Sequence, residues 1–214
     1  KFFAPPPGEM LRELVRRGDI TTAQAEMAAT IPVAQDITAE ADSGGHTDNR
    51  PALALFPTIL ALRDRMQNEH AYERPLRVGA AGGVSTPHSA AAAFAMGAAY
   101  VLTGSINQAC REAGTSDAVR KMLAQVEQAD VRMAPAADMF EMGVKLQVLT
   151  RGSMFAMRAQ KLHDVYTSCE GLDAIPAAQR GKLERIIFRA PLEEIWSQTR
   201  EFWMNRDEGQ VERA

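Results

Sequence analysis

The stretch "LRVGAAGGVSTPHSAAAAFAMGAAYVLTGS", residues 76–105, contains the pattern that decides the fold. It opens with a short apolar run that ends at Gly82-Gly83, and it closes with a second apolar run that ends at Gly104-Ser105. An alanine-rich segment of helical character separates the two runs. Strands that alternate with helices are typical of βαβ units, so this stretch predicts a parallel sheet.

The alanine-rich segment carries the start and stop signals of a helix. Ser85 or Thr86 can cap its first turn, and Pro87 suits the first helical position. Gly97 lies where the helix should end, because glycine readily adopts the left-handed conformation that follows a helix. We therefore expect one helix between the two strands.

Upstream of this stretch, the same order of elements occurs once more. The segment "DITAEADSGGHTDNRP", residues 36–51, reads as a strand that runs into Gly44-Gly45 and then into a polar corner. The apolar spacing of "FPTILALRDRMQ", residues 56–67, predicts a helix that begins near Pro57. Residues 35–110 thus form the α/β part of the chain.

Helical patterns flank the α/β part on both sides. Residues 1–34 hold a proline-rich start and two helical segments, with Thr21 or Thr22 as a cap. Residues 111–214 are predicted to be purely helical, with one helix after Ser116. The predicted organisation is a helical lead (1–34), the last βα units of a sheet or barrel (35–110) and a helical C-terminal subdomain (111–214).

The composition restricts the class of protein. The 214 residues are 46% hydrophobic and 24% charged, with a net charge of -3 and no cluster of Lys and Arg, which argues against nucleic-acid binding. The longest apolar run, residues 89–102, is too short to span a bilayer. With no secretion signal in view and two distant cysteines that we expect to be reduced thiols, the sequence predicts a cytoplasmic location.

Small residues end all three predicted strands, and this suggests a ligand site. The strand ends are Gly44-Gly45, Gly82-Gly83 and Gly104-Ser105. In parallel α/β folds, ligands bind beyond the carboxyl ends of the strands, and the last two strands of a (β/α)8 barrel typically hold a phosphate. Glycine lets the backbone approach such a group and donate N–H groups to it. The alternative is that all three pairs are ordinary tight turns.

His46 follows the first glycine pair directly and is the candidate for acid–base chemistry. A lone histidine can equally be a surface or structural residue. A metal site built from Asp42, His46 and Asp48 has no spacing that matches a known ligand set, so we expect no metal.

Three segments resemble the PfaD family, the trans-acting enoyl reductases of bacterial polyunsaturated fatty acid and polyketide synthases. The segments are "EADSGGHTDNRP" (40–51), "VGAAGGVSTPHSAAAAFAMGAAYVLTGSINQACREAGTSD" (78–117) and "DMFEMGVKLQVLTRG" (138–152). The glycine-containing stretches "GGH" (44–46), "AAGG" (80–83) and "GS" (104–105) are also similar, more distantly, to those of nitronate monooxygenases and a flavin-dependent enoyl-carrier-protein reductase, both FMN-binding TIM barrels. Because only three barrel strands are visible, the chain resembles the C-terminal part of such a barrel.

The resemblance implies an FMN site and a catalytic histidine. His46 would be the active-site histidine, Gly44 and Gly45 would lie against the flavin or its ribityl chain, and the two later strand ends would hold the phosphate. The full set of cofactor-binding positions implied is Ser43, Gly44, Gly45, Ala81, Gly82, Gly83, Gly104 and Ser105.

The resemblance further implies an FMN-dependent enoyl reductase that uses NADPH or NADH. Its substrate would be a 2-enoyl thioester on an acyl carrier protein, and other parts of the synthase would be partners; a homo-oligomer is left open. Two alternatives are an FMN-dependent nitronate monooxygenase and a non-catalytic scaffold or docking piece of a synthase.

The helical interpretation also extends to "DMFEMGVKLQVL", residues 138–149. It predicts an apolar cluster on a helix that roofs the active-site mouth or packs onto the barrel, formed by Met139, Phe140, Met142, Leu146 and Leu149. Basic residues nearby would meet an acidic carrier protein: Lys145, Arg151, Arg158 and Lys161.

Overall fold

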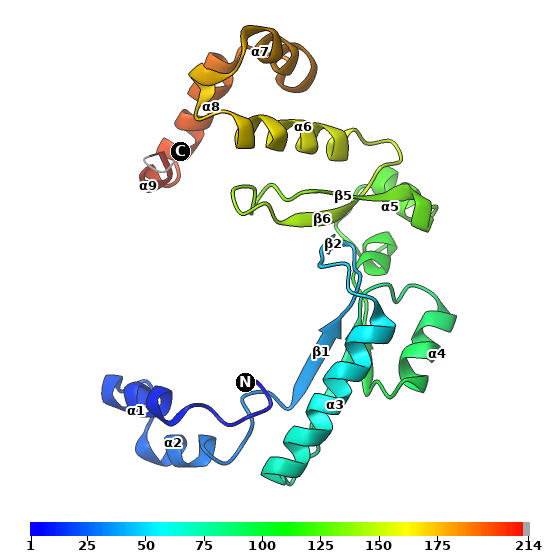
Figure 1. The fold of residues 1–214 in the computed structure, drawn as a ribbon, viewed down its shortest axis with the longest axis vertical. Helices are drawn as coiled ribbons and strands as arrows, with labels where there is room; N and C mark the ends of the chain where they lie inside the picture. The colour runs from blue at the N-terminus through cyan, green and yellow to red at the C-terminus, as the bar shows by residue number, and fades with distance from the viewer. Residues whose placement is uncertain (212–214) are drawn as a thin grey trace. The chain divides into compact units, whose positions relative to one another are not determined.

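The computed structural model describes residues 1–211 and divides the chain into two compact units, Lys1–Ser153 and Met154–Ala214 (Figure 1). The first unit contains all the strands of the described residues, and the second is helical. Within the described part of the chain, no helix combines the length and the apolar character that crossing a membrane demands.

The first unit is built on a parallel sheet of three strands, in the order β1-β3-β4. The strands are β1 (Asp36–Glu40), β3 (Arg77–Ala81) and β4 (Tyr100–Leu102), each within the segment predicted from the sequence. Asp36 pairs with Arg77 at one end of the ladder and Glu40 with Ala81 at the other. All three carboxyl ends therefore meet at one edge of the sheet.

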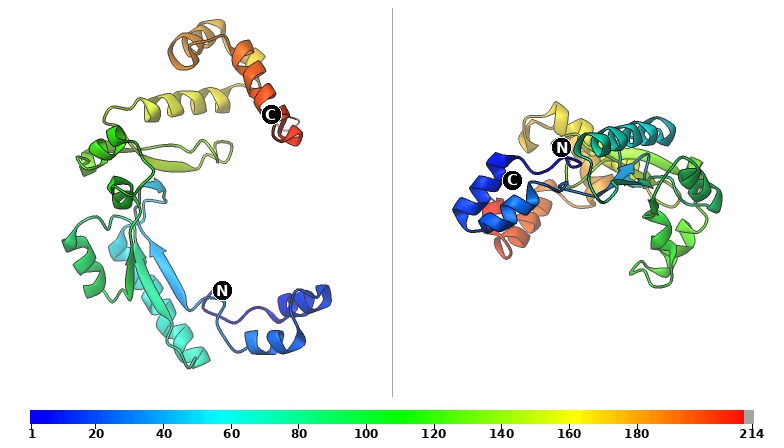
Figure 2. Two further views of the ribbon diagram at one scale, coloured as in Figure 1. Left: turned by 180° about the vertical axis from the view of Figure 1, so that it is seen from behind. Right: turned by 90° about the horizontal axis from the view of Figure 1, so that it is seen from below.

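Helices cover one face of this sheet. In Figure 1, α3 (Ala52–His70) lies in front of the strands, and it lies behind them in the reversed view of Figure 2. The core joins Phe56 of α3 to Val78 of β3 and Ala93 of α4 (Pro87–Ala95), all at most 3% exposed. Thr86, one of the two predicted cap residues, caps the helix α4, because its hydroxyl accepts a hydrogen bond from the Ser89 N–H.

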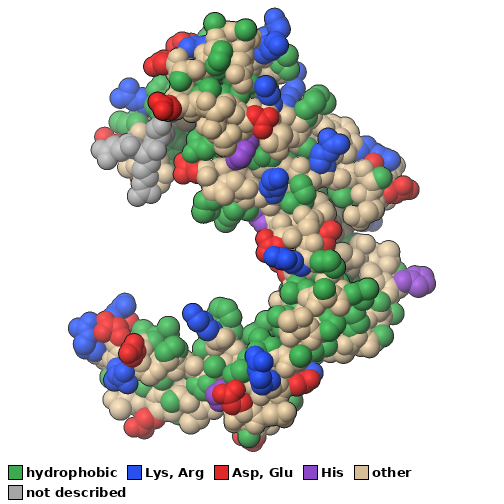
Figure 3. Space-filling view, in the orientation of Figure 1, with side chains coloured by type: hydrophobic (Ala, Val, Ile, Leu, Met, Phe, Trp, Pro, Cys, Tyr) green, Lys and Arg blue, Asp and Glu red, His purple; other side chains and the backbone are tan. Residues whose placement is uncertain are grey.

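The helix α3 begins earlier than its sequence pattern indicates. We expected it to start near Pro57, but it starts at Ala52, with the Leu55 N–H bonded to the Pro51 carbonyl. Pro57 lies within the helix and leaves one carbonyl without its usual partner. In the space-filling view, hydrophobic side chains gather over the side of α3 turned to the viewer (Figure 3). Leu53, in the first turn, is largely exposed.

The N-terminal lead forms two short helices, α1 (Gly8–Arg17) and α2 (Thr22–Ala28). Thr21 caps α2 through a reciprocal pair of hydrogen bonds with Gln24, which confirms one of the two predicted caps. Phe3 ties the lead to the sheet unit, because its ring belongs to the core of the sheet and its carbonyl accepts from the Tyr72 hydroxyl (2.9 Å).

The expectation that residues 111–214 are purely helical is wrong. Two antiparallel strands, β5 (Val131–Pro135) and β6 (Lys145–Leu149), form a hairpin, and β6 also pairs with the two-residue strand β2 (Gly45–His46). Arg132 of β5 is exposed while both of its neighbours are half-buried, which is the two-residue period of a strand.

The remaining elements of the described residues are helices. In the first unit lie η1 (Ser105–Ala109), α5 (Asp117–Leu123) and η2 (Gln128–Asp130). The second unit contains α6 (Phe155–Ser168), η3 (Leu172–Ala174), α7 (Ala177–Leu183), η4 (Glu184–Phe188), α8 (Leu192–Met204) and α9 (Glu208–Val211). Its own small core is made by Val165, Ile175, Leu183 and Leu192. This is the helical subdomain predicted to follow the sheet, although it begins later, at Met154.

Candidate functional site

A cavity of about 1250 Å3 lies in the first unit, at the carboxyl ends of the parallel strands. All eight positions predicted to bind a cofactor line it: Ser43, Gly44, Gly45, Ala81, Gly82, Gly83, Gly104 and Ser105. Its far wall is apolar and comes from α5 and the hairpin, where Val119, Met122 and Leu123 are joined by Leu146 and Leu149. The cavity therefore has a glycine-rich side and an aliphatic side.

The glycines at the strand-end turns occur there for different structural reasons. A side chain on Gly82 would meet the Ala41 backbone at 2.7 Å, and Gly82 has a φ of 85°. Close packing of two strand ends therefore accounts for this glycine without any ligand. A Cβ on Gly104 would meet nothing within 4 Å. The packing of the protein thus leaves room for a side chain at position 104 and does not explain why a glycine occurs there.

Backbone donors at these corners remain available. Within residues 1–211, the N–H groups of Gly83, Val84 and Gly104 have no hydrogen-bond acceptor. All three residues line the cavity, and adjacent free N–H groups on glycine-containing turns make a concave site for an anion. The corners therefore fit a phosphate group.

The start of α4 contributes less to such a site than the sequence suggests. Ser89 Oγ accepts from the N–H groups of Ser85 (3.1 Å) and Thr86 (3.0 Å), and the Ser89 N–H is taken by Thr86. These three donors complete the cap of the helix and are not free for a ligand. The donors that fit an anion are those of the strand-end turns.

A hydrogen-bond network holds the loop that carries Gly44 and Gly45. Asp42 Oδ1 accepts from Asn49 Nδ2 (2.7 Å) and from Gln147 Nε2 (3.1 Å), and so it ties the loop to β6. Sequence reasoning missed Gln147, because it lies 105 positions from Asp42 and was assigned to a helix. The network leaves Asp42 committed to amide donors, and no three His, Cys, Asp or Glu side chains of the described residues come together as a metal site would need.

His46 lies beside the cavity but is not one of the residues that line it. Its neighbour Gly45 and its ladder partner Leu146 do line the cavity, so His46 sits at the rim. Its ring Nε2 is 3.1 Å from Asp138 Oδ1, in the loop between β5 and β6. No sequence signal marked Asp138, which the fold brings to His46 across 92 positions.

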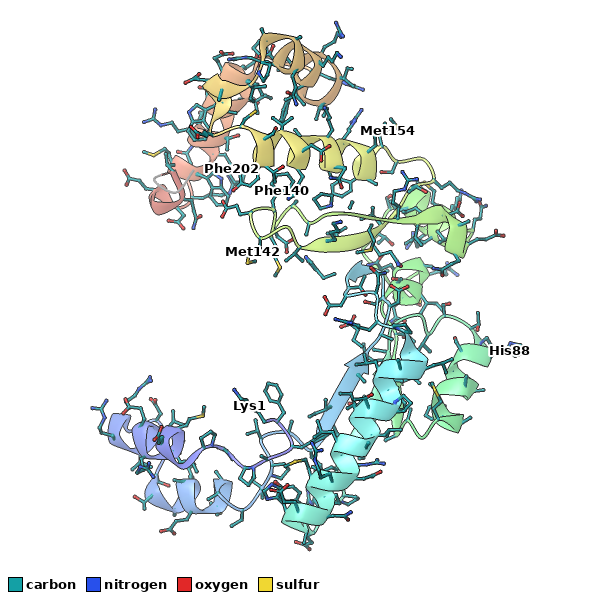
Figure 4. The ribbon with its side chains drawn as sticks, viewed as in Figure 1. Lys1, His88, Phe140, Met142, Met154 and Phe202 are labelled. Atoms are coloured by element: carbon teal, nitrogen blue, oxygen red, sulfur yellow. The ribbon has the colours of Figure 1, made fainter. Side chains whose placement is uncertain are left out.

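The predicted apolar cluster of residues 138–149 is divided by the hairpin. Leu146 and Leu149 belong to β6 and line the cavity, whereas Phe140 and Met142 lie in the loop that joins the two strands (Figure 4). Met142 is 71% exposed. The cluster therefore does not form a helical roof, because its residues are divided between a loop and a strand.

Two of the four basic residues predicted to meet a carrier protein either make contacts within this chain or are partly buried. Arg151 pairs with Asp130 (Nη2–Oδ2 3.3 Å) and donates to the Gln125 carbonyl. Arg158 has its Nε buried. Lys145 and Lys161 are exposed.

The sequence has close relatives among synthase proteins. It is 48% identical over 207 residues to a component of the polyunsaturated fatty acid synthase of Thraustochytrium sp., a match that covers 96% of this chain and 14% of the relative. It is 45% identical over 195 residues to "Polyketide biosynthesis protein PksE" of Bacillus subtilis, covering 91% of this chain and 25% of the relative. The chain thus spans a quarter or less of these curated relatives.

A solved structure gives the fold. The enoyl reductase domain of MlnA, from the macrolactin biosynthesis cluster of Bacillus amyloliquefaciens, matches 99% of this chain with a TM-score of 0.90 and 40% identity. The match covers 47% of that domain's chain. Residues 169–214 also match the inserted helical domain of [acyl-carrier-protein] S-malonyltransferase.

These likenesses confirm the predicted fold class, the C-terminal portion of a barrel of the TIM type followed by a helical subdomain. The chain therefore has the fold of part of an enoyl reductase domain, and its sequence is related to a segment of polyunsaturated fatty acid synthases and polyketide biosynthesis proteins.

Proposed function

We propose that this chain is part of a PfaD-type, FMN-dependent enoyl reductase that acts on 2-enoyl thioesters carried by an acyl carrier protein. The observation that carries the proposal is the Gly104 corner, which combines open space with a free N–H and lines the same cavity as Gly83. The likeness over 99% of the chain to an enoyl reductase domain supports the same activity.

The strand-end turns would hold the cofactor. The N–H groups of Gly83, Val84 and Gly104 would bind the phosphate of FMN, and the turn at Gly44 and Gly45 would lie against the flavin or its ribityl chain. When bound and reduced by NADPH or NADH, FMN supplies a hydride to the β-carbon of the enoyl group.

His46 would complete the reduction at the rim of the cavity. Hydride addition at the β-carbon leaves negative charge on the α-carbon and the thioester oxygen. An imidazole can polarise that oxygen or deliver a proton to the α-carbon at neutral pH. The aliphatic wall of α5, which includes Met122 and Leu123, would receive the acyl chain.

The test begins with the visible absorption spectrum of the protein purified from its source. Flavin bands are expected, together with NADPH oxidation that depends on an enoyl thioester. His46→Ala should keep the flavin and slow reduction by about 10²- to 10⁴-fold. A protein without flavin would overturn the proposal in favour of a scaffold role, and oxygen uptake with an alkyl nitronate in place of enoyl reduction would favour a monooxygenase.

A further inference from the structure

We propose that Asp138 is a positioning residue for His46: its carboxylate accepts a hydrogen bond from ring Nε2–H, so that the Nδ1–H of the protonated ring is the donor presented to the substrate. This inference rests on the proposed function and names a residue on which that chemistry depends. The contact joins Nε2 to Asp138 Oδ1 at 3.1 Å. A carboxylate only accepts hydrogen bonds, so Nε2 must carry a hydrogen in this contact.

The main chain of His46 is fixed independently of Asp138. His46 pairs with Leu146 in the ladder between β2 and β6, and the Ser43 hydroxyl donates to the His46 carbonyl (3.3 Å). Ser43 is itself only 8% exposed. With the backbone anchored in this way, the remaining freedom of His46 is rotation of its side chain.

Asp138 is well placed to remove that freedom. It follows Ala134 and Ala136, both fully buried, and the Ala136 N–H bonds to the Val144 carbonyl (2.8 Å) beyond the last strand pair. The base of the loop is therefore fixed, and Asp138 stands two residues past that anchor. The hairpin supplies both the backbone partner and the side-chain partner of His46.

The exposure of the pair defines what it can contribute. The side chains of His46 and Asp138 are 46% and 62% exposed, and ion pairs at such exposure contribute little to stability. The contribution of Asp138 is therefore orientation of the ring, which affects turnover and not the fold. This separates a positioning role from a structural one by experiment.

The experiment compares Asp138→Ala, Asp138→Asn and a control, Glu141→Gln, in the flavin-containing protein. Glu141 is an exposed carboxylate on the same loop, and among the described residues it has no hydrogen bond or ion pair. When the ring is neutral, nitrogen-15 NMR reports which of the two histidine nitrogens carries the hydrogen. Turnover, KM, flavin content and melting temperature are measured beside it.

Asp138→Ala should lose the Nε2–H preference of His46 and lower kcat roughly tenfold, with KM, flavin content and melting temperature unchanged. Asp138→Asn keeps a carbonyl acceptor and should recover part of both signals, and Glu141→Gln should match the wild type. The proposal is overturned if Asp138→Ala gives the ring spectrum and kcat of Glu141→Gln, or if its melting temperature falls along with kcat. Wild-type turnover in His46→Ala would instead refute the proposed role of His46, while the ring spectrum still decides whether Asp138 holds it.

Discussion

The parallel sheet and the hairpin of the first unit differ in what holds them. The sheet β1-β3-β4 is backed by helices and buries Phe56 and Val78 almost completely. The hairpin β5–β6 is mostly half-exposed, and its links to the glycine loop are a two-residue ladder and polar contacts. The sheet thus acts as the framework of the site, and the hairpin holds the residues at the rim of the site in position.

The largest expected effect lies in the framework. Phe56→Ala empties a fully buried position beneath the sheet and should lower the free energy of unfolding by about 3–5 kcal/mol. Leu146→Ala, at a half-buried hairpin position, should cost less than half as much. Denaturant unfolding of both variants measures the difference, and equal losses would contradict the division into framework and rim.

Gly82 and Gly104 both lie at the carboxyl edge of the sheet, but replacing each with alanine should have different effects on stability and on FMN binding. Gly82→Ala forces a side chain onto a residue with φ of 85° and against Ala41, and should destabilise by about 1–3 kcal/mol. Gly104→Ala should leave the melting temperature of the flavin-free protein unchanged but reduce bound FMN, because the methyl group enters the space assigned to the phosphate. Full flavin occupancy in a stable Gly104→Ala protein would remove that assignment.

Gln147→Leu tests the link between hairpin and loop. Losing the bond from Gln147 to Asp42 should cost about 1 kcal/mol locally and speed amide exchange in the hairpin. Asn49→Ala is the matched control, since it removes the other donor to Asp42 and should loosen the loop alone. If both variants speed exchange in the hairpin equally, the link does not run through Gln147.

The smallest effect concerns Asp36 and Arg77, a bidentate pair across β1 and β3 (2.6 Å for both contacts). Hydrogen bonding from Arg77 lowers the pKa of Asp36 below its ordinary value. The stability this shift contributes is full above the ordinary carboxyl pKa, about 4, and is lost as the pH falls through the lowered value. Asp36→Asn should therefore lower the melting temperature slightly at pH 7, and the difference should shrink as the pH falls below the ordinary carboxyl pKa. A difference that grows in acid would contradict this sign.

The sheet could be predicted from the sequence because its signals are local. Each strand of the sheet is followed by a glycine within four residues, and Thr86, Pro87 and Gly97 mark the start and end of α4. The glycine corners that line the cavity followed from the rule that parallel strands present their carboxyl ends together. Neither inference needed a contact between distant parts of the chain.

The hairpin could not be predicted in the same way. Its strands are joined by a loop without a tight-turn dipeptide, and the spacing of Met139, Met142 and Leu146 imitates a helix. Its partners, Asp138 for His46 and Gln147 for Asp42, are set by pairing across about a hundred residues. The residues next to His46 in the sequence therefore do not indicate these partners.

The pairing of His46 with Leu146 has a consequence for folding. These ladder partners lie one hundred residues apart in the sequence, whereas Asp36 and Arg77 of the sheet are separated by 41. Closing the longer loop has the greater entropic cost, and it cannot happen until more of the chain has been synthesised. During synthesis the parallel sheet can therefore form first, while the corner that carries His46 gains its geometry only after the hairpin has left the ribosome.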